Sequence, residues 1–167
     1  MPTVCFTGHR PPKINEDNEK AISLALESCI EKLISRGYTD FISGMALGAD
    51  ILAAEQVIKA KEKYPCVTLE CAVPYPGQRD RRSESDRKKY VYLEFMADKT
   101  TLVSDRYTRF CMQKRNQYMV DNADIVVAVY DGKSKGGTAN TLAYAHRRNK
   151  KIIYITMEGK VIDSEGA

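Results

Sequence analysis

Short apolar runs alternate along the chain with longer, more polar stretches. The apolar runs predict strands at residues 3–7, 38–44, 66–76, 99–104, 123–132 and 151–156. The stretches between them are interpreted as helices at residues 15–36, 47–63, 79–97, 108–122 and 136–150. In the first of these helices, one apolar stripe is formed by Ile22, Leu26, Cys29, Ile30 and Leu33. Strands and helices are therefore expected to alternate through the chain.

Several expected strands are continuously apolar instead of alternating, which indicates burial on both faces of a sheet. With helices between them, they predict an α/β fold whose mostly parallel sheet is covered on both sides. Right-handed crossovers bring the carboxyl ends of parallel strands to one edge, and ligands of such folds bind in the crevice there. We expect one domain over residues 1–157, followed at 158–167 by a short polar tail that frays.

Composition narrows the class of protein. A hydrophobic content of 43% favours a globular chain over a disordered one. No apolar run approaches the roughly 18 residues of a membrane span, and the first residues lack a signal-peptide pattern, so a cytoplasmic protein without a membrane partner is expected. The five cysteines are odd in number and have no CxxC spacing, which predicts neither a disulfide framework nor a metal site. The net charge of +4 permits an anionic small molecule or a nucleic acid.

Three glycine-rich turns each follow an apolar run. They are TGHR at 7–10, SGMALGAD at 43–50 and DGKSKGGTAN at 131–140. Glycine lets a ligand approach the backbone closely, and the helix that follows directs free N–H groups and its positive dipole end at an anion. The three turns together predict a cradle for a phosphate-bearing ligand. None matches GxGxxG or the P-loop pattern, so a standard NAD or ATP site is not indicated.

The segments TGHRP at 7–11, SGMALGAD at 43–50 and QKRNQYMVDNADIVVAVYDGKSKGGTANTLAYA at 113–145 together resemble the YpsA-like family of the SLOG superfamily. This Rossmann-like group joins the Smf/DprA proteins with the LOG ("lonely guy") proteins. The second segment is similar to the SGxAxGxD turn of DprA. The third is similar to the LOG segment that carries a catalytic arginine. The resemblance spans about residues 3 to 155 and implies a single-domain, Rossmann-like three-layer sandwich with a nucleotide-related ligand.

Two basic residues are the first candidates for the anion. Arg10 follows Gly8 and His9 at the end of the first strand and offers bidentate contacts to a phosphate. The alternative is that His9 is a satisfied loop histidine and Arg10 a surface charge. Arg115 shares a stripe with Met112 and Met119, so its charge needs a partner or lines a cavity. Its resemblance to the LOG arginine implies a ligand contact, and the alternative is an ion pair with Asp124 or Asp121.

Further candidates lie on the other turns. Asp50, at the start of a helix, either complements the helix dipole or binds ribose hydroxyls. Tyr75 and Gln78 leave the third strand at the same edge, whereas the basic segment 79–89 is interpreted as a solvated face with local ion pairs. The full set of expected ligand contacts is Gly8, His9, Arg10, Ser43, Gly44, Gly48, Asp50, Gln78, Arg115, Asn116, Asp131, Gly136, Gly137, Thr138 and Asn140.

No catalytic residue is assigned. LOG hydrolases carry a loop PGGxGTxxE whose glutamate works with the arginine, and here the glutamate position falls on Ala143. The absence favours binding over this hydrolysis, unless Asp131, Asp50 or Glu55 substitutes for the glutamate.

Three function classes follow from these observations. The first is a sensor or regulatory protein that binds a nucleotide or an ADP-ribose-like ligand, with Mg²⁺ as a companion of the phosphate. The second is a hydrolase that acts on a nucleotide-type N-glycosidic or phosphate bond. The third is a DprA-like nucleic-acid-binding module, which the mild net charge and the interspersed acids count against. A homo-oligomer is an expectation by analogy alone.

Overall fold

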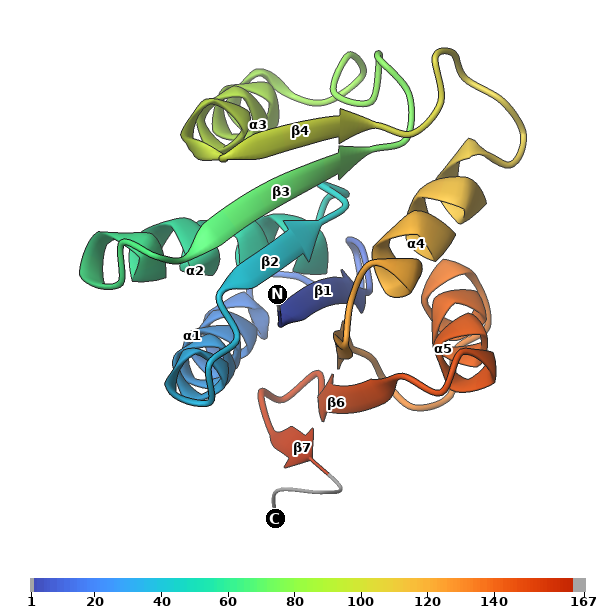
Figure 1. Ribbon diagram of the computed structural model, residues 1–167. Coiled ribbons are helices and arrows are strands. Elements are labelled where there is room, and N and C mark those ends of the chain that lie inside the picture. Colours follow the sequence, from blue (N-terminus) through green and yellow to red (C-terminus); the bar gives the residue numbers. More distant parts are fainter. Residues whose placement is uncertain (1, 164–167) are drawn as a thin grey trace.

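The computed structural model describes residues 2–163 and contains, within them, a seven-stranded sheet in the order β4-β3-β2-β1-β5-β6-β7 (Figure 1). The strands are β1 (Thr3–Gly8), β2 (Asp40–Ser43), β3 (Thr68–Val73), β4 (Lys99–Leu102), β5 (Ile125–Val129), β6 (Lys151–Ile155) and β7 (Val161–Asp163). The helices are α1 (Glu19–Ser35), α2 (Ala49–Lys63), α3 (Glu84–Met96), α4 (Cys111–Asp121) and α5 (Gly137–Arg147). All pairings except β6 with β7 are parallel. The predicted α/β class with a mostly parallel sheet is confirmed.

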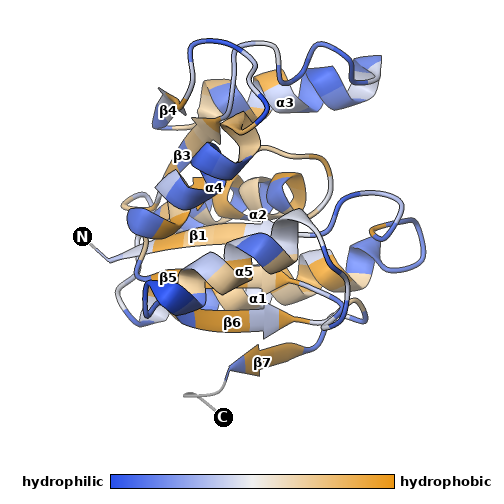
Figure 2. Cartoon of the chain, turned by 90° about the vertical axis from the view of Figure 1, so that its right-hand side faces the viewer, coloured by the Kyte–Doolittle hydropathy of each residue, from blue (hydrophilic) through white to orange (hydrophobic). Residues whose placement is uncertain are grey.

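Helices cover both faces of the sheet. One core lies beneath α1, α2 and α3, where Ile30 and Val57 meet Val4 and Phe41 of the strands. A smaller core lies beneath α4 and α5, which stand together on the other side of the sheet (Figure 1). Neighbouring strand residues point to opposite faces, so Val4 belongs to the first core and Cys5 to the second. Figure 2 shows the apolar colour concentrated on the central strands.

The order of the strands reverses beside β1. From β1 the chain builds the sheet outward through β2, β3 and β4, and it then returns to place β5 on the other side of β1. The loops after β1 and β5 leave the sheet in opposite directions here, which opens a crevice at the carboxyl ends of the strands. The glycine-rich turns after β1, β2 and β5 all reach this edge.

One expectation for the end of the chain is wrong in part. Residues 158–163 do not fray: Val161–Asp163 form β7, which pairs antiparallel with β6. Gly159 turns the hairpin with a φ of +85°, and Nη1 of Arg36, the residue after α1, lies 3.4 Å from Oδ2 of Asp163. The remaining part of the expected tail, residues 164–167, lies outside the described residues. Among residues 2–163, none of the helices combines the length and the apolar content needed to cross a bilayer.

Candidate functional site

A cleft of about 1070 Å³ opens at the carboxyl edge of the sheet. Loops after β1, β2, β3, β4 and β5 contribute to it, together with α4 and the start of α5. Its walls are formed by Thr7, Gly8, His9, Arg10, Pro11, Pro12, Lys13, Ala46, Leu47, Asp50, Tyr75, Gly77, Gln78, Asp80, Arg81, Arg82, Tyr107, Met112, Arg115, Asn116, Lys135, Gly137 and Thr138. Six of these side chains are lysine or arginine and two are aspartate, so the cleft is electropositive.

The amino end of α2 is fixed against the loop after β1. The N–H of Ala49 donates to the carbonyl oxygen of His9 at 3.1 Å. Gly48 has a φ of +95°, and a Cβ at this position would lie 2.5 Å from the same oxygen. Only glycine fits this turn without strain. The conformation at Gly48 therefore points the amino end of α2 toward the cleft.

Two buried side chains of opposite charge, Asp50 and Arg115, line the cleft, and both lie close to Gly44. The two side chains are 7% and 5% exposed. Arg115 donates through Nη1 to the carbonyl oxygen of Gly44 and through Nε to Oδ1 of Asn116 at 2.8 Å. A Cβ on Gly44 would stand 2.7 Å from Nη1 of Arg115 and 2.8 Å from Oδ2 of Asp50. Glycine at position 44 is therefore what lets the guanidinium and the carboxylate share this space.

Burial disfavours the charged forms of both side chains, and the charge of each side chain counteracts this effect on the other. Burial raises the pKa of Asp50 above its ordinary value, while the charge of Arg115 and a 3.3 Å hydrogen bond from the N–H of Ala46 oppose the shift. Burial likewise lowers the pKa of Arg115, and Asp50 opposes that shift. The charges of Arg10 and Arg82 also act on Asp50. Three arginines thus surround one carboxylate, and the group as a whole favours an added anion.

Arg82 is a residue of this group that sequence reasoning missed. Its Nη2 donates to the carbonyl oxygen of Met45 at 2.7 Å, and its guanidinium lies over the ring of Tyr90, 5.1 Å from the centroid. Its Nη1 is buried and has no hydrogen-bond partner among the described residues. A signal was available: Ser83 is a typical N-cap and accepts from the N–H of Asp86, which places Arg82 in the preceding loop and not on the helix surface.

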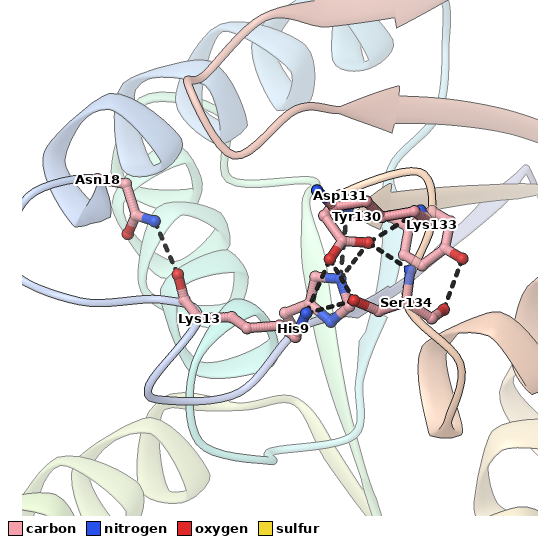
Figure 3. Close-up of polar contacts among 7 residues, drawn as sticks. All are labelled: His9, Lys13, Asn18, Tyr130, Asp131, Lys133 and Ser134. Atoms are coloured by element: carbon pink, nitrogen blue, oxygen red, sulfur yellow. Dashed lines mark hydrogen bonds and ion pairs between the residues drawn. The ribbon is translucent and has the colours of Figure 1, made fainter.

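A polar cluster joins the loop after β1 to the loop after β5 (Figure 3). Nε2 of His9 accepts from the N–H of Asp131 at 3.2 Å and lies 3.3 Å from its Oδ1. The ammonium group of Lys13 lies 2.8 Å from Oδ2 of Asp131. The carboxylate also accepts from the N–H groups of Lys133 and Ser134, at 3.0 and 2.8 Å, and from the hydroxyl of Ser134. These donors, Lys13 first among them, hold the pKa of Asp131 well below its usual range.

Replacing Asp131 by alanine should release the loop at 131–136. The N–H groups of Lys133 and Ser134 lose their acceptor, so we expect their hydrogen exchange to accelerate several-fold. Because the folded-state pKa of Asp131 is depressed, its contribution to the stability of this loop is fully present above the ordinary carboxyl pKa. The contribution disappears only as the pH falls through the lowered pKa. Exchange measured by NMR at neutral pH tests this, with Asp105→Ala in the loop before α4 as the control. Unchanged exchange in Asp131→Ala would refute the assignment.

The structure brings most of the sequence-predicted residues to the cleft. Those that line it are Gly8, His9, Arg10, Asp50, Gln78, Arg115, Asn116, Gly137 and Thr138. The predicted residues that lie outside the lining set are Ser43, Gly44, Gly48, Asp131, Gly136 and Asn140. Ser43 is buried and its hydroxyl donates to the carbonyl oxygen of Asp50 at 2.8 Å. Gln78 lines the cleft, but both ends of its amide already have protein partners. Its Nε2 donates to the carbonyl oxygen of Gly44, and its Oε1 accepts from the hydroxyl of Tyr90, both at 2.9 Å.

Two alternatives considered from sequence are settled by these contacts. The expected ion-pair partners of Arg115 are wrong, since Asp121 pairs with Arg148 and Asp124 accepts from the N–H of Thr3. The interpretation of the basic segment 79–89 as a face with local ion pairs is confirmed only for Lys88 and Glu84; Arg79 pairs with Glu94 further along the chain, and Lys89 pairs with Glu55 of α2.

Ala143 bears on the question of catalysis. It is exposed on α5 and is not among the residues that line the cleft. The side chain at this position therefore does not determine the chemistry of the cleft. The carboxylates that line it belong to Asp50 and Asp80.

Comparison with known proteins gives one family match and several relatives. The model of the YspA SLOG family matches residues 4–159. The SPbeta prophage-derived protein YoqJ of Bacillus subtilis is 35% identical over 135 residues, which cover 73% of this chain and 78% of YoqJ. A UPF0398 protein of Halalkalibacterium halodurans is 29% identical over 161 residues, covering 92% and 85%.

Two solved structures share the fold. DNA processing protein A of Helicobacter pylori, described for its single-stranded DNA binding mode, superposes with a TM-score of 0.61 at 18% identity, over 92% of this chain and 64% of that one. The molybdenum cofactor carrier protein of Chlamydomonas reinhardtii superposes with a TM-score of 0.57 at 15% identity, over 93% and 77%.

Proposed function

Because the chain belongs to the YspA SLOG family, we propose that its cleft binds a nucleotide or nucleotide-derived ligand through the phosphate, as a sensor or regulatory protein. The observation that carries the proposal is the buried Nη1 of Arg82, a charged donor that has no partner among residues 2–163 and belongs to a side chain that lines the cleft. An unpaired buried donor is costly, and a phosphate oxygen satisfies it with a charge-assisted hydrogen bond.

The surroundings of Arg82 support the same ligand. The cations at the wall outnumber the carboxylates, and the helices α2 and α5 both begin at the cleft, at Ala49 and Gly137. Helix amino ends and arginine side chains are the two protein features that hold phosphate best. One structural neighbour is described for binding single-stranded DNA, whose backbone carries a phosphate group between successive sugars. We keep the cytoplasm as the expected compartment, since nucleotides are made and used there.

Hydrolysis of the bound nucleotide is a second candidate, favoured by Asp50. This carboxylate lies at the wall of the cleft, and burial raises its pKa in the direction that suits a general acid. The two candidates differ in what happens to the ligand. Mass spectrometry of the ligand after incubation distinguishes them: an intact nucleotide supports binding, whereas free base with sugar phosphate, or free phosphate, supports hydrolysis.

Arg82→Met tests the phosphate contact. Methionine keeps the apolar stem but removes the guanidinium, so affinity for a nucleotide should fall about 10- to 100-fold, as expected for hydrogen bonds to a charged group. The assay is isothermal titration calorimetry with AMP, ADP, NAD and ADP-ribose. The matched control is Arg79→Met, in the same loop but paired with Glu94 outside the cleft. Equal affinities in the two variants, or no binding of any of the four compounds to the wild type, would refute the proposal.

A further inference from the structure

Two tyrosines form an aromatic pair at one end of the cleft. Tyr75 follows β3 and Tyr107 follows β4, and both line the cleft. Their ring centroids are 5.1 Å apart with an interplanar angle of 85°, an edge-to-face arrangement. Tyr107 is nevertheless 67% exposed. A large aromatic side chain thus contacts its neighbour, lines the cleft and keeps most of its surface accessible.

The pair lies apart from the phosphate-binding features. Strand order places β3 and β4 on one side of β1, whereas Gly137 follows β5 on the other side. Adjacent strands are about 4.8 Å apart, so the end of β3 lies roughly 10 Å across the sheet from the end of β1. Arg82 lies in the same loop as Tyr75, lines the cleft, and its charge acts on Asp50. The cleft therefore has an aromatic end on the side of β3 and β4, and its lysine and arginine side chains extend from there toward β1 and the start of α5.

We propose that Tyr107, supported by Tyr75, stacks against the base of the ligand, so that the cleft selects nucleoside phosphates over sugar phosphates and free phosphate. The inference rests on the proposed function, because it takes the phosphate contacts of these lysine and arginine side chains as given. Stacking tolerates any base, since each has a π-face. The sequence around Tyr107 contains no motif that would have indicated this contact.

The absence of tryptophan from the chain gives a direct test. Tyr107→Trp introduces a single indole at the proposed stacking position. Nucleoside 5′-monophosphates with each of the four RNA bases should quench its fluorescence on binding, whereas ribose 5-phosphate should not. The control is Phe110→Trp, three residues away on an exposed ring outside the cleft, whose fluorescence should respond to neither probe.

Calorimetry with the same probes gives the magnitude. Tyr107→Ala should lower the affinity for the nucleoside monophosphates about 5- to 100-fold and leave the affinity for ribose 5-phosphate within about twofold of the wild type. Tyr107→Phe should retain wild-type affinity for both kinds of probe. If Tyr107→Ala weakens both kinds of probe equally, or neither, stacking is refuted while phosphate binding stands. If the wild type binds ribose 5-phosphate as tightly as the nucleotides, base recognition is likewise refuted. If the wild type binds no probe at all, the proposed function fails, and this inference fails with it.

Discussion

The Gly8→Ala protein is expected to lose about 3 kcal/mol of unfolding free energy, at the upper end of what overpacking a core costs. A Cβ at this position would stand 2.4 Å from Cβ of Ala49 and 2.9 Å from the carbonyl oxygen of Val129. Both atoms are fixed, one at the start of α2 and the other in β5, so the helix or the strand has to move. For a chain of this length the loss corresponds to a melting temperature lower by about 6–12 °C, measurable by calorimetry.

Gly137→Ala is the matched control for this substitution. A Cβ on Gly137 would meet nothing within 4 Å, and the residue opens α5 with an ordinary φ. Alanine should therefore be neutral or raise stability by up to about 1 kcal/mol, because it lowers the entropy of the unfolded chain. If the two variants have the same melting temperature, the close approach of β1, α2 and β5 at Gly8 does not limit stability.

Arg115→Met is expected to destabilise the fold by about 3 kcal/mol at neutral pH, because it leaves the buried carboxylate of Asp50 without its principal cation. The sign of the pH dependence follows from the raised pKa of Asp50, which the substitution raises further. The loss should be small below the ordinary carboxyl pKa of about 4, where Asp50 is protonated in both states. It should grow as the pH rises through the raised folded-state pKa.

Urea unfolding of the wild type and the variant at pH 5, 6, 7 and 8 measures this difference. The double variant Arg115→Met with Asp50→Asn removes the charge that was left unpaired. It should recover most of the stability and lose the pH dependence of the difference. A double variant as unstable as Arg115→Met alone would show that the hydrogen bond from Arg115 to Gly44 matters, and not its charge.

The sheet and its helices could be predicted from sequence because their signals are local. Continuous apolar runs identify strands buried on both faces, and the turns that follow them belong to one edge of any parallel sheet. Strand β7 was missed because it has no such local signal. Its three residues, Val161–Asp163, are too few for a pattern, and they form a strand only because β6 presents an open edge to them.

The cleft was predicted less completely, since its contacts join residues that are distant in the chain. His9 was interpreted as facing the anion, but its Nε2 is engaged by Asp131, 122 positions away. Arg82 and Tyr107 lie on loops whose local sequence does not indicate which way a side chain turns. Arg115 was found because a charge on an apolar stripe is a conflict visible in the sequence itself.

The central position of β1 has a consequence for protein synthesis. One edge of β1 pairs with β2, which follows within about forty residues, but the other edge pairs with residues 125–129. A nascent chain therefore carries β1 half-paired until β5 has left the ribosome, and parallel pairing at this separation is slow. The loop that fixes His9 and the amino end of α5 come later still. The complete cleft therefore forms only after residues 131–138 have been synthesised, so a ligand that stabilises it gives no help to the earlier segments of the growing chain.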